Sequence, residues 1–380
     1  MELGTTILTA ITAQFVLCAL TSLYWSGLWR KDVRAAWRAA VREQYYDGTL
    51  DSDDVDSYLC TLDIHTNGSA TGPTVAYVHG GSWFRGTPRC FFYSGNAAPY
   101  FASQKGVIGA SIGYRLAKAR PIVLYLLYPL AVTTVISLVC ICCAVPFVGT
   151  EIPWCQVAAV VCVSTFSFMW SHGLHPLGGH TYRIREKGVT GNEMLRDLAR
   201  GVKFLKDRGR ALALRDQRIF LVGHSAGAHL SACLLSGGWH LKEVGLEPGD
   251  ISGVALLCGP LDLEHLVHKH LHPIMARFVR SMALDPAFGP DTSSWTSWKP
   301  AALLGKMNFG KHCPKWLLFT GTKDKLVSAD DSDKLEVKLR EVGVDVHRKW
   351  FNGGHLPSDF GRRSDTVIPE VLALFGITTP

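Results

Sequence analysis

The sequence predicts an α/β protein in which a largely parallel sheet carries helices on both faces. From Asp47 onward, short apolar runs alternate with helical patterns, and such alternation is typical of parallel sheets. The chain has 380 residues, of which 47% are hydrophobic and 19% are charged. A chain of this length and composition is able to bury a large core, in one domain or in two.

Seven apolar runs are expected to form strands. They lie at residues 55–65, 74–81, 106–116, 218–223, 253–260, 315–322 and 345–354. The pattern also predicts a helix over 192–209, because Met194, Leu195 and Leu198 recur on one helical face. A second helix is expected over 332–343, directly before the last strand.

Three long segments contain no charged residue, and each is long enough to span a bilayer, which needs about 20 residues. They lie at 3–29, 121–150 and 152–171. We expect the first to be a transmembrane anchor and the other two to form a membrane hairpin, 121–172, inserted in a loop of the α/β domain. The alternatives are a cleaved signal peptide for the first segment and a buried helix pair for the others.

Basic residues flank these segments on one side only. The stretch 30–46 begins RKDVRAAWRAAVR and predicts a basic juxtamembrane helix, and basic residues also precede and follow the hairpin. Loops rich in Lys and Arg stay in the cytosol, and such flanks attract anionic lipid head groups. We therefore expect membrane lipid as a partner and the remaining domain, 47–380, on the cytosolic side.

The composition argues against several other classes of protein. The formal net charge is +7, but no basic stretch interleaved with aromatic residues indicates a nucleic-acid interface. The eleven cysteines are scattered and form no series of CxxC pairs, so neither a zinc site nor a disulfide framework is expected. The sequence implies no metal and no organic cofactor, and it leaves the oligomeric state open.

The stretch RIFLVGHSAGAHLSACLL, residues 218–235, places a serine between two glycines where a predicted strand turns into a helix. Its pentapeptide GHSAG fits the pattern G-x-S-x-G. In that pattern the glycines permit a strained serine backbone and let the helix approach the strand closely. We expect Ser225 to be a nucleophile, and the alternative is a serine that only caps the helix.

A serine nucleophile needs a base, and the base needs a carboxylate that orients it. Asp324 comes just after the strand KWLLFTGT, and His355 comes just after the last strand and two glycines. Both lie in loops at the carboxyl ends of strands, where an open α/β sheet places its site. We expect Asp324 to orient His355 and His355 to activate Ser225.

Other acids and histidines fit these roles less well. Two competing acids look like the start of a helix: Asp330 and Asp331. Three histidines precede the acid or neighbour the serine: His79, His224 and His229. A further group indicates a solvated or membrane-facing surface: His265, His268, His270 and His272.

Hydrolysis by a serine nucleophile passes through an oxyanion, which needs preorganised N–H donors. Ala226 follows the nucleophile and supplies one. The stretch HGGSWFRG follows a predicted strand, and Gly80 and Gly81 are able to turn their amides inward because they lack side chains. The alternative is a plain glycine turn. We expect His79 and Asp197 to brace loops rather than to take part in the chemistry.

Four aromatic residues lie in or shortly after HGGSWFRG, and we expect them to line a substrate groove: Phe84, Phe91, Phe92 and Tyr93. The alternative is that they belong to the core or face lipid. The region 261–300 is expected to cover part of the site, with its stretch WTSWKPA shaping the pocket in a way that the sequence does not specify.

The motifs GHSAGAH, HGGSWFRG, GYRL, GTKDKLV and GGH resemble those of the α/β-hydrolase superfamily. Within it the chain is similar to the hormone-sensitive-lipase-like carboxylesterases, where HGG marks the oxyanion loop. More narrowly, it resembles isoprenylcysteine α-carbonyl methylesterase-like proteins, from residue 55 to the end. The apolar hairpin directly after GYRL departs from that pattern. The resemblance implies a methyl ester of a prenylated cysteine as substrate, at the endoplasmic reticulum or Golgi membrane.

We therefore expect an integral membrane serine esterase that hydrolyses a carboxylic ester of a prenylated cysteine, or of a similarly lipophilic molecule, through an acyl-enzyme. A general lipid or xenobiotic carboxylesterase, or an arylformamidase, is the alternative among hydrolases. A catalytically silent membrane-tethered binding protein is the alternative from another class, and it predicts a broken triad or oxyanion loop.

Overall fold

The computed structural model describes most of the α/β part of the chain. The described residues are 40–45, 59–66, 71–88, 97–104, 106–118, 188–304, 313–355 and 367–377. The chain divides into two compact units, and all of these residues belong to the unit formed by Trp25–Ala119 and Arg185–Pro380. The other unit, Met1–Tyr24 with Arg120–Ile184, lies outside the described residues.

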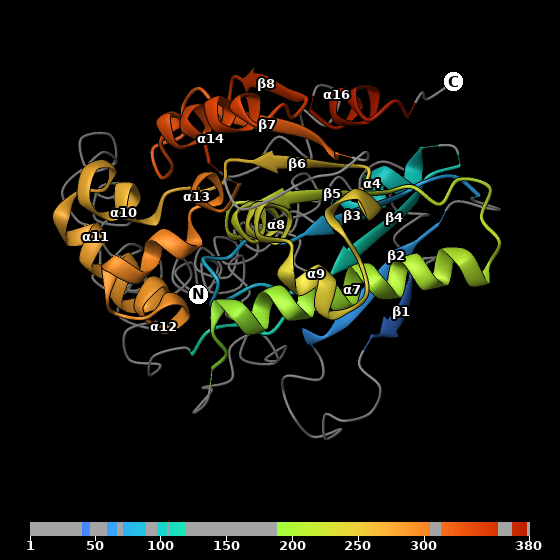
Figure 1. Ribbon diagram of the computed structural model, residues 1–380, viewed down its shortest axis with the longest axis horizontal. Coiled ribbons are helices and arrows are strands. Elements are labelled where there is room, and N and C mark those ends of the chain that lie inside the picture. The colour runs from blue at the N-terminus through green and yellow to red at the C-terminus, as the bar shows by residue number, and fades with distance from the viewer. Residues whose placement is uncertain are drawn as a thin grey trace, which may run out of the picture. The chain divides into compact units, whose positions relative to one another are not determined.

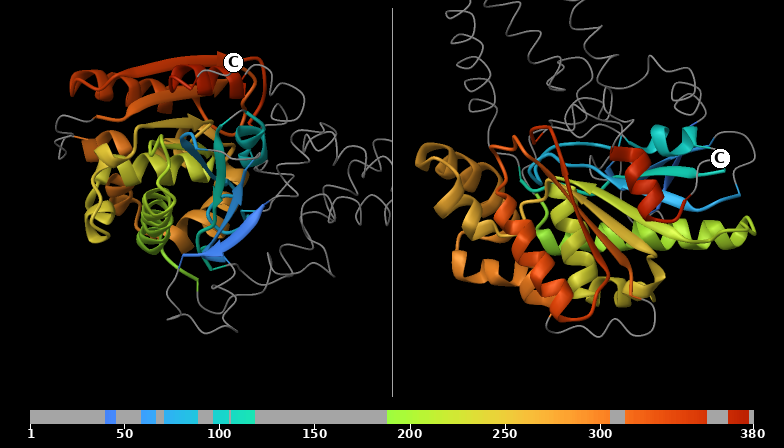
Figure 2. Two further views of the ribbon diagram at one scale, coloured as in Figure 1. Left: turned by 90° about the vertical axis from the view of Figure 1, so that its right-hand side faces the viewer. Right: turned by 90° about the horizontal axis from the view of Figure 1, so that it is seen from above.

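Eight strands of the described chain form one sheet in the order β1-β2-β4-β3-β5-β6-β7-β8. They are β1 (Val41–Gln44), β2 (Thr61–His65), β3 (Thr74–Val78), β4 (Ile108–Ile112), β5 (Ile219–His224), β6 (Gly253–Leu257), β7 (Lys315–Gly321) and β8 (Val346–Phe351). β2 is antiparallel to β1 and β4, whereas all other pairs are parallel. Figure 2 shows the sheet twisting from β1 at one edge to β8 at the other. The predicted, mostly parallel sheet is confirmed.

Successive residues of the central strand β5 face opposite sides of the sheet. Ile219 and Leu221 join the core on one face, whereas Phe220 and Val222 join the core on the other. Side chains alternate in this way along any strand, so a strand with helices on both sides has to be apolar throughout. This requirement explains why β5 reads as a continuous apolar run in the sequence.

Helices cover both cores, as the sequence predicts (Figure 1). The face that includes Ile219 packs against α7 (Gly191–Ala211), α8 (Ala226–Gly237), α13 (Pro300–Leu304) and α14 (Ala329–Glu341). The opposite face packs against α4 (Ala98–Ser103) and α16 (Val367–Leu374). α7 begins at a capping box in which Glu193 accepts a hydrogen bond from the backbone N–H of Thr190. The two helices predicted from periodicity are α7 and α14.

A group of short helices follows β6 and lies beyond one end of the sheet (Figure 1). It consists of α10 (Leu263–His265), η2 (Leu266–His270), α11 (Pro273–Val279), η3 (Arg280–Leu284), α12 (Asp285–Phe288) and η4 (Thr292–Trp298). Two further turns, α9 (Trp239–Glu243) and η1 (Pro248–Asp250), join α8 to β6. η2 and η3 are π-helical. Pro286 lies two residues after the end of η3. It has no N–H to continue α-helical bonding and its ring crowds the carbonyl four residues earlier, so the helix widens.

The predicted basic helix over 30–46 is wrong at its carboxyl end. Val41–Gln44 is strand β1, which pairs with the edge of the sheet at β2. Nε of Arg42 lies 2.7 Å from a carboxylate oxygen of Asp63 on β2, so this charge belongs to the sheet rather than to a lipid-facing helix. Because β1 is part of the sheet, the α/β domain begins before residue 47, the boundary that the sequence indicated.

The predicted integral membrane location, at the endoplasmic reticulum or Golgi with a cytosolic catalytic domain, is contradicted. No helix among the described residues is both long and apolar enough to cross a membrane. The longest, α7, has 21 residues but a charged face, and the more apolar α8 has only 12 residues, about 18 Å of helix where a bilayer core needs about 30 Å. The predicted anchor, 3–29, and hairpin, 121–172, lie outside the described residues.

Candidate active site

Ser225 lies on the sharp turn between β5 and α8, with φ 52° and ψ −120°. Backbone of this kind is rare for a residue that carries a Cβ atom. A methyl group at Gly227 would collide with the carbonyl oxygens of Val78 and His79, and one at Gly223 would press against the first turn of α8. Both glycines of GHSAG are therefore required, because α8 packs directly against the strands at this point.

The structure brings Ser225, His355 and Asp324 into one hydrogen-bonded row. Nε2 of His355 lies 2.9 Å from Oγ of Ser225, and Nδ1 of His355 lies 2.9 Å from Oδ2 of Asp324. Ser225 follows β5, Asp324 follows β7 and His355 follows β8. The carboxyl ends of these parallel strands meet at one edge of the sheet, so residues distant in sequence come into contact there.

Hydrogen bonds hold Asp324 in its charged form. Burial alone would raise the pKa of this carboxyl group, but bonds from His355 and from two backbone amides outweigh it and lower the pKa. Oδ1 accepts from the N–H groups of Leu326 and Val327 at 2.9 Å and 3.0 Å. A charged carboxylate only accepts hydrogen bonds, so Nδ1 of His355 carries a proton. When that ring is neutral, its Nε2 accepts the hydrogen of the Ser225 hydroxyl.

His224 holds the backbone of His355, the predicted base, through a contact that the sequence did not indicate. Its Nε2–H donates to the backbone carbonyl oxygen of His355 at 2.8 Å, and the two rings lie 5.3 Å apart. Burial, reinforced by the nearby charge of His355, lowers the pKa of His224 to about 3. The ring is therefore neutral, and its one proton is on Nε2. The rejection of His224 as a base is consistent with this geometry.

The first glycine of HGGSWFRG, Gly80, lies against the serine turn. A methyl group at Gly80 would come within 3.0 Å of Cβ of Ser225 and within 2.9 Å of the carbonyl oxygen of His224. Ala226 is the first residue of α8, where N–H groups have no acceptor within the helix. Of the expected N–H donors, Gly80 and Ala226 thus lie next to Ser225, while Gly81 packs against Arg85. The role of all three toward an oxyanion stays a prediction.

The backbone is strained immediately after these glycines. φ is 121° at Gly81, 52° at Ser82 and 61° at Trp83. The N–H of Phe84 donates to the carbonyl oxygen of Ser82 at 2.8 Å, which closes a tight three-residue turn around Trp83. Strain of this kind persists only where the surroundings enforce it, and it is concentrated at functional sites.

His79 and Tyr114 supply part of that enforcement. Nδ1–H of His79 donates to the carbonyl oxygen of Gly80 at 2.8 Å, and the Tyr114 hydroxyl donates to the carbonyl oxygen of His79 at 2.9 Å. The two rings stack at 4.3 Å. Burial lowers the pKa of His79 to about 4, so the ring stays neutral. The expected bracing role of His79 agrees with these contacts.

Asp197 braces the other side of the same segment. Its fully buried carboxylate accepts hydrogen bonds from the backbone N–H, Nε and Nη2 of Arg115, at 3.0, 2.8 and 2.9 Å. The motif GYRL therefore joins the loop that holds Gly80 and Gly81, through Tyr114, to α7, through Arg115. This explains a motif for which the sequence alone offered only a resemblance.

The region 261–300 reaches the site from behind α8. Nε2–H of His229, one turn after Ser225, donates to the carbonyl oxygen of Trp298 at 2.9 Å. The edge of the buried Trp83 ring meets the rings of His229 and Phe288 at 5.3 Å and 5.2 Å. Trp298 of WTSWKPA thus holds the helix that follows the serine, and Phe288 packs against the strained loop beside it.

The predicted substrate groove is described only in part. Phe84 is half-buried and packs against the core beside the oxyanion loop. Phe91, Phe92 and Tyr93 lie outside the described residues, so the groove stays a prediction.

The histidine group near residue 265 is not simply a solvated surface. His268 and His272 are exposed, but Nδ1 of His265 lies 2.6 Å from a carboxylate oxygen of the fully buried Asp331. Asp330 and Asp331 lie in the first turn of α14, as the sequence predicts. Neither contacts His355 in the described contacts, and Asp324 occupies that position.

Cys258 also belongs to this edge of the sheet, although the sequence gave no reason to single it out. It directly follows β6, between the strands that precede Ser225 and Asp324, and it is buried with φ 50°. Of the five described non-glycine residues with positive φ, four surround the site: Ser82, Trp83, Ser225 and Cys258. Backbone strain in the described chain is thus concentrated around the serine.

Known proteins resemble this chain in both sequence and fold. The family model BD-FAE matches residues 180–339. The isoprenylcysteine alpha-carbonyl methylesterase ICME of Arabidopsis thaliana is 28% identical over 179 residues, which cover 45% of this chain and 40% of that relative. The chain thus matches less than half the length of this curated relative.

Solved esterases share the fold at low sequence identity. Esterase B from Lactobacillus rhamnosis has a TM-score of 0.55 and 17% identity, over 99% of this chain and 96% of that one. The hyperthermophilic esterase from Pyrobaculum calidifontis has a TM-score of 0.55 and 11% identity, over 98% and 94% of the two chains. Likeness at such identities establishes the fold, which is that of the α/β-hydrolases.

The fold, the family model and the relatives agree on a carboxylesterase-like α/β-hydrolase. The enzyme class predicted from the sequence, a serine carboxylic-ester hydrolase, agrees with these findings as well. The narrower resemblance, to isoprenylcysteine α-carbonyl methylesterase-like proteins, is supported by the plant relative.

Proposed function

We propose that this protein is a serine esterase in which Ser225 attacks the carbonyl carbon of a carboxylic ester. The row of hydrogen bonds from Ser225 through His355 to Asp324 is the observation that carries the proposal. The strained serine turn and the glycine loop beside it support the same chemistry. An intact row of this kind also argues against a catalytically silent binding protein.

In the first half of the reaction, Oγ of Ser225 forms a bond to the ester carbon while Nε2 of His355 takes the hydroxyl proton. Asp324 stabilises the imidazolium that results, since its carboxylate accepts from Nδ1–H. The N–H groups of Gly80, Gly81 and Ala226 are the proposed donors to the oxyanion. The tetrahedral intermediate then expels the alcohol, which receives the proton from Nε2 and leaves an acyl-enzyme.

In the second half, water replaces the alcohol. His355 takes a proton from the water as its oxygen attacks the acyl carbon, and the collapse of the second intermediate returns that proton to Oγ of Ser225. The products are an acid and an alcohol, and the enzyme regains its starting state. None of these steps requires a metal or an organic cofactor.

We further propose a methyl ester of a prenylated cysteine, or a similarly lipophilic ester, as the substrate. The plant relative named as an isoprenylcysteine methylesterase supports this choice. Phe84 and the aromatic residues Phe91, Phe92 and Tyr93 are the proposed apolar lining. A general carboxylesterase is the second candidate, supported by the esterase fold alone.

Methanol release from farnesylcysteine methyl ester tests both parts of this proposal. The full chain is assayed beside short-chain p-nitrophenyl esters, with Ser225→Ala as the inactive variant. Ser236→Ala is the matched control, because Ser236 is also buried on α8 and its hydroxyl has no hydrogen-bond partner among the described residues.

Preference for the prenylated ester, abolished in Ser225→Ala and kept in Ser236→Ala, is the expected result. Activity on short esters alone would replace the substrate proposal by a general carboxylesterase. The esterase proposal itself would be overturned if the full chain hydrolysed no ester and Ser225 did not react with a fluorophosphonate probe.

A further inference from the structure

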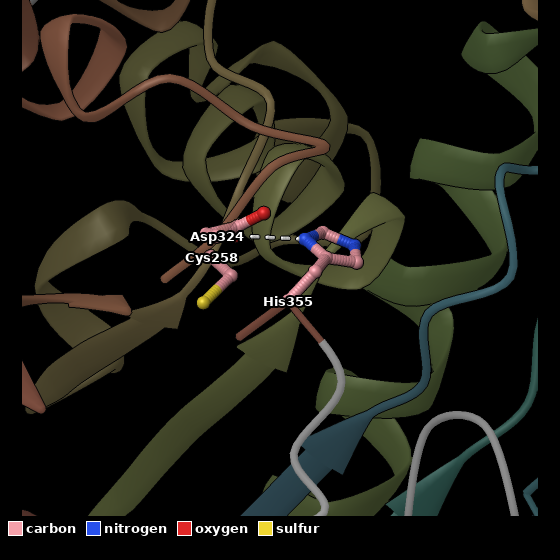
Figure 3. Close-up of side chains that lie close together, drawn as sticks. All are labelled: Cys258, Asp324 and His355. Atoms are coloured by element: carbon pink, nitrogen blue, oxygen red, sulfur yellow. Dashed lines mark hydrogen bonds and ion pairs between the residues drawn. The ribbon is translucent and has the colours of Figure 1, made fainter. Parts of the chain in front are cut away.

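Three side chains of different chemistry lie close together at the carboxyl ends of β6, β7 and β8. Cys258 follows β6, Asp324 follows β7 and His355 follows β8, and these strands are neighbours in the sheet. A sulfur, a carboxylate oxygen and an imidazole nitrogen from them all lie within 4.8 Å of one another. Figure 3 shows the Cys258 side chain beside the hydrogen-bonded pair of Asp324 and His355. The proposed esterase chemistry has no use for the thiol.

The spacing of these donors is close to that of a tetrahedral zinc site. Zn–N and Zn–O bonds of about 2.1 Å and a Zn–S bond of about 2.3 Å put the donors roughly 3.3 to 3.6 Å apart. Nδ1 of His355 and Oδ2 of Asp324 are already 2.9 Å apart, so this pair has to open by only a few tenths of an ångström. The sulfur lies within 4.8 Å of both other donors, so it has to close by no more than about 1.5 Å, and rotation about χ1 of the cysteine is the movement that would bring it closer.

The donor types also favour a thiophilic cation over Mg²⁺ or Ca²⁺. Magnesium and calcium prefer oxygen ligands, whereas sulfur, nitrogen and one carboxylate oxygen suit Zn²⁺. A thiolate and a carboxylate together neutralise both charges of the ion.

We propose that Cys258, Asp324 and His355 form an inhibitory site for a thiophilic divalent cation, with Zn²⁺ as the ion of choice. Occupancy of the site disables the base of the hydrolase. The binding site stands on geometry alone, whereas the inhibition rests on the proposed esterase function.

The inhibition follows from where the protons go. In the resting site, the neutral ring of His355 carries its proton on Nδ1 and accepts from Ser225 at Nε2. When Zn²⁺ binds Nδ1, the single proton of the neutral ring has to lie on Nε2. The thiol of Cys258 gives up its proton to solvent as the Zn–S bond forms. Nε2 then donates toward Oγ of Ser225 instead of accepting, and the serine loses its base.

Absorption spectroscopy with Co²⁺ tests the site without reference to activity. Co²⁺ takes zinc sites, and a bond to a thiolate adds a sulfur-to-cobalt charge-transfer band that oxygen and nitrogen ligands do not give. The full chain is titrated with Co²⁺ alone, beside Cys258→Ser and Cys258→Ala. Cys313→Ser is the matched control, because Cys313 is an exposed cysteine.

The expected result is a charge-transfer band in the full chain and in Cys313→Ser that both Cys258 variants lose. Asp324→Asn should keep the band but weaken Co²⁺ binding at least about tenfold, because a charged ligand becomes neutral. No band at millimolar Co²⁺, or a band that Cys313→Ser abolishes, overturns the site. These outcomes stand whether or not the chain proves to be an esterase.

Labelling of Ser225 by a fluorophosphonate probe tests the inhibition. Zn²⁺ should slow labelling of the full chain and of Cys313→Ser, and a chelator should restore it. Cys258→Ser should label at the normal rate and need at least about tenfold more Zn²⁺ for the same slowing. Cobalt binding at Cys258 that leaves labelling unchanged overturns the inhibitory role.

Discussion

Two histidine–aspartate pairs in this molecule look alike and have different surroundings. Nδ1 of His355 lies 2.9 Å from Asp324, and Nδ1 of His265 lies 2.6 Å from Asp331. In the first pair the other ring nitrogen faces the hydroxyl of Ser225, whereas in the second it lies 3.8 Å from a carboxylate oxygen of the exposed Asp330. The same two residue types therefore face a hydroxyl group in one region and a second carboxylate in the other.

The two carboxyl groups differ as well. Asp324 accepts two backbone amides, and these bonds together with His355 lower its pKa despite burial. Burial raises the pKa of Asp331 to about 6, against the opposing effect of His265, and its Oδ2 has no hydrogen-bond partner among the described residues. The proposed base, His355, thus has an acid that backbone amides keep charged and a hydroxyl group at its second nitrogen, and within the described part of the chain the pair of His265 and Asp331 has neither.

Replacing the two acids should separate the pairs most sharply. Asp324→Asn presents an amide to Nδ1 of His355 and favours the tautomer with its proton on Nε2, so kcat should fall about 10³- to 10⁴-fold. Asp331→Asn should change kcat less than about threefold, because His265 does not touch Ser225. Steady-state kinetics on a p-nitrophenyl ester measures both. An equal loss of kcat in the two variants would mean that the two pairs do not differ in their effect on catalysis.

His224 tests whether the position of the base matters as much as its charge. His224→Leu removes the bond to the carbonyl oxygen of His355, and we expect kcat to fall about 10- to 100-fold while KM changes little. His224→Gln keeps an N–H donor and should recover part of that loss.

His229→Gln is the matched control for this prediction. His229 is equally buried and donates to a carbonyl oxygen of Trp298, away from the base. The His229→Gln variant should have a lower Tm but an unchanged kcat. If His229→Gln and His224→Gln reduce kcat alike, then His224 acts only through general stability.

The raised pKa of Asp331 predicts how stability depends on pH. The pKa is 3.8 in the unfolded chain and about 6 in the folded one, so between these values the folded state binds more protons. Stability contributed by this group is therefore lost as the pH rises from about 4 to about 6.

Urea unfolding of the full chain and Asp331→Asn, at pH 4.5 and pH 7, measures this effect. From pH 4.5 to pH 7, the free energy of unfolding of Asp331→Asn should rise relative to that of the full chain by on the order of 1 to 3 kcal/mol. The groups that face Asp331 are His265, Asp262 and Lys334. A difference between the two proteins that does not change with pH would contradict a raised pKa for Asp331.

The smallest effect is expected at the second nitrogen of His265. Asp330 is 68% exposed and 3.8 Å from Nε2, and exposed ion pairs contribute little in water. Asp330→Asn should change the free energy of unfolding by less than about 0.5 kcal/mol and leave kcat unaltered. A larger change in the free energy of unfolding or in kcat would mean that the contact between Asp330 and Nε2 of His265 matters for stability or for activity.

Much of this molecule was predictable because the signals are local. Periodicity gave seven of the strands and both long helices, and the glycines of GHSAG marked the strained turn at Ser225. The chain order of serine, acid and histidine then selected Asp324 and His355 from their competitors. β1 was missed because Val41–Gln44 is a short edge strand. Its one basic residue, Arg42, continues a basic stretch that resembles a membrane flank until Asp63 is placed beside it.

The sequence by itself determined the α/β pattern, the serine turn and the residues expected to act there, since each depends on neighbours along the chain. Only the tertiary structure decided that His224 holds His355, that His265 pairs with Asp331 and that Cys258 joins the acid and the base. These contacts arise because β5, β6, β7 and β8 lie side by side and in parallel. Their carboxyl ends therefore meet, and no local pattern encodes which residues meet there.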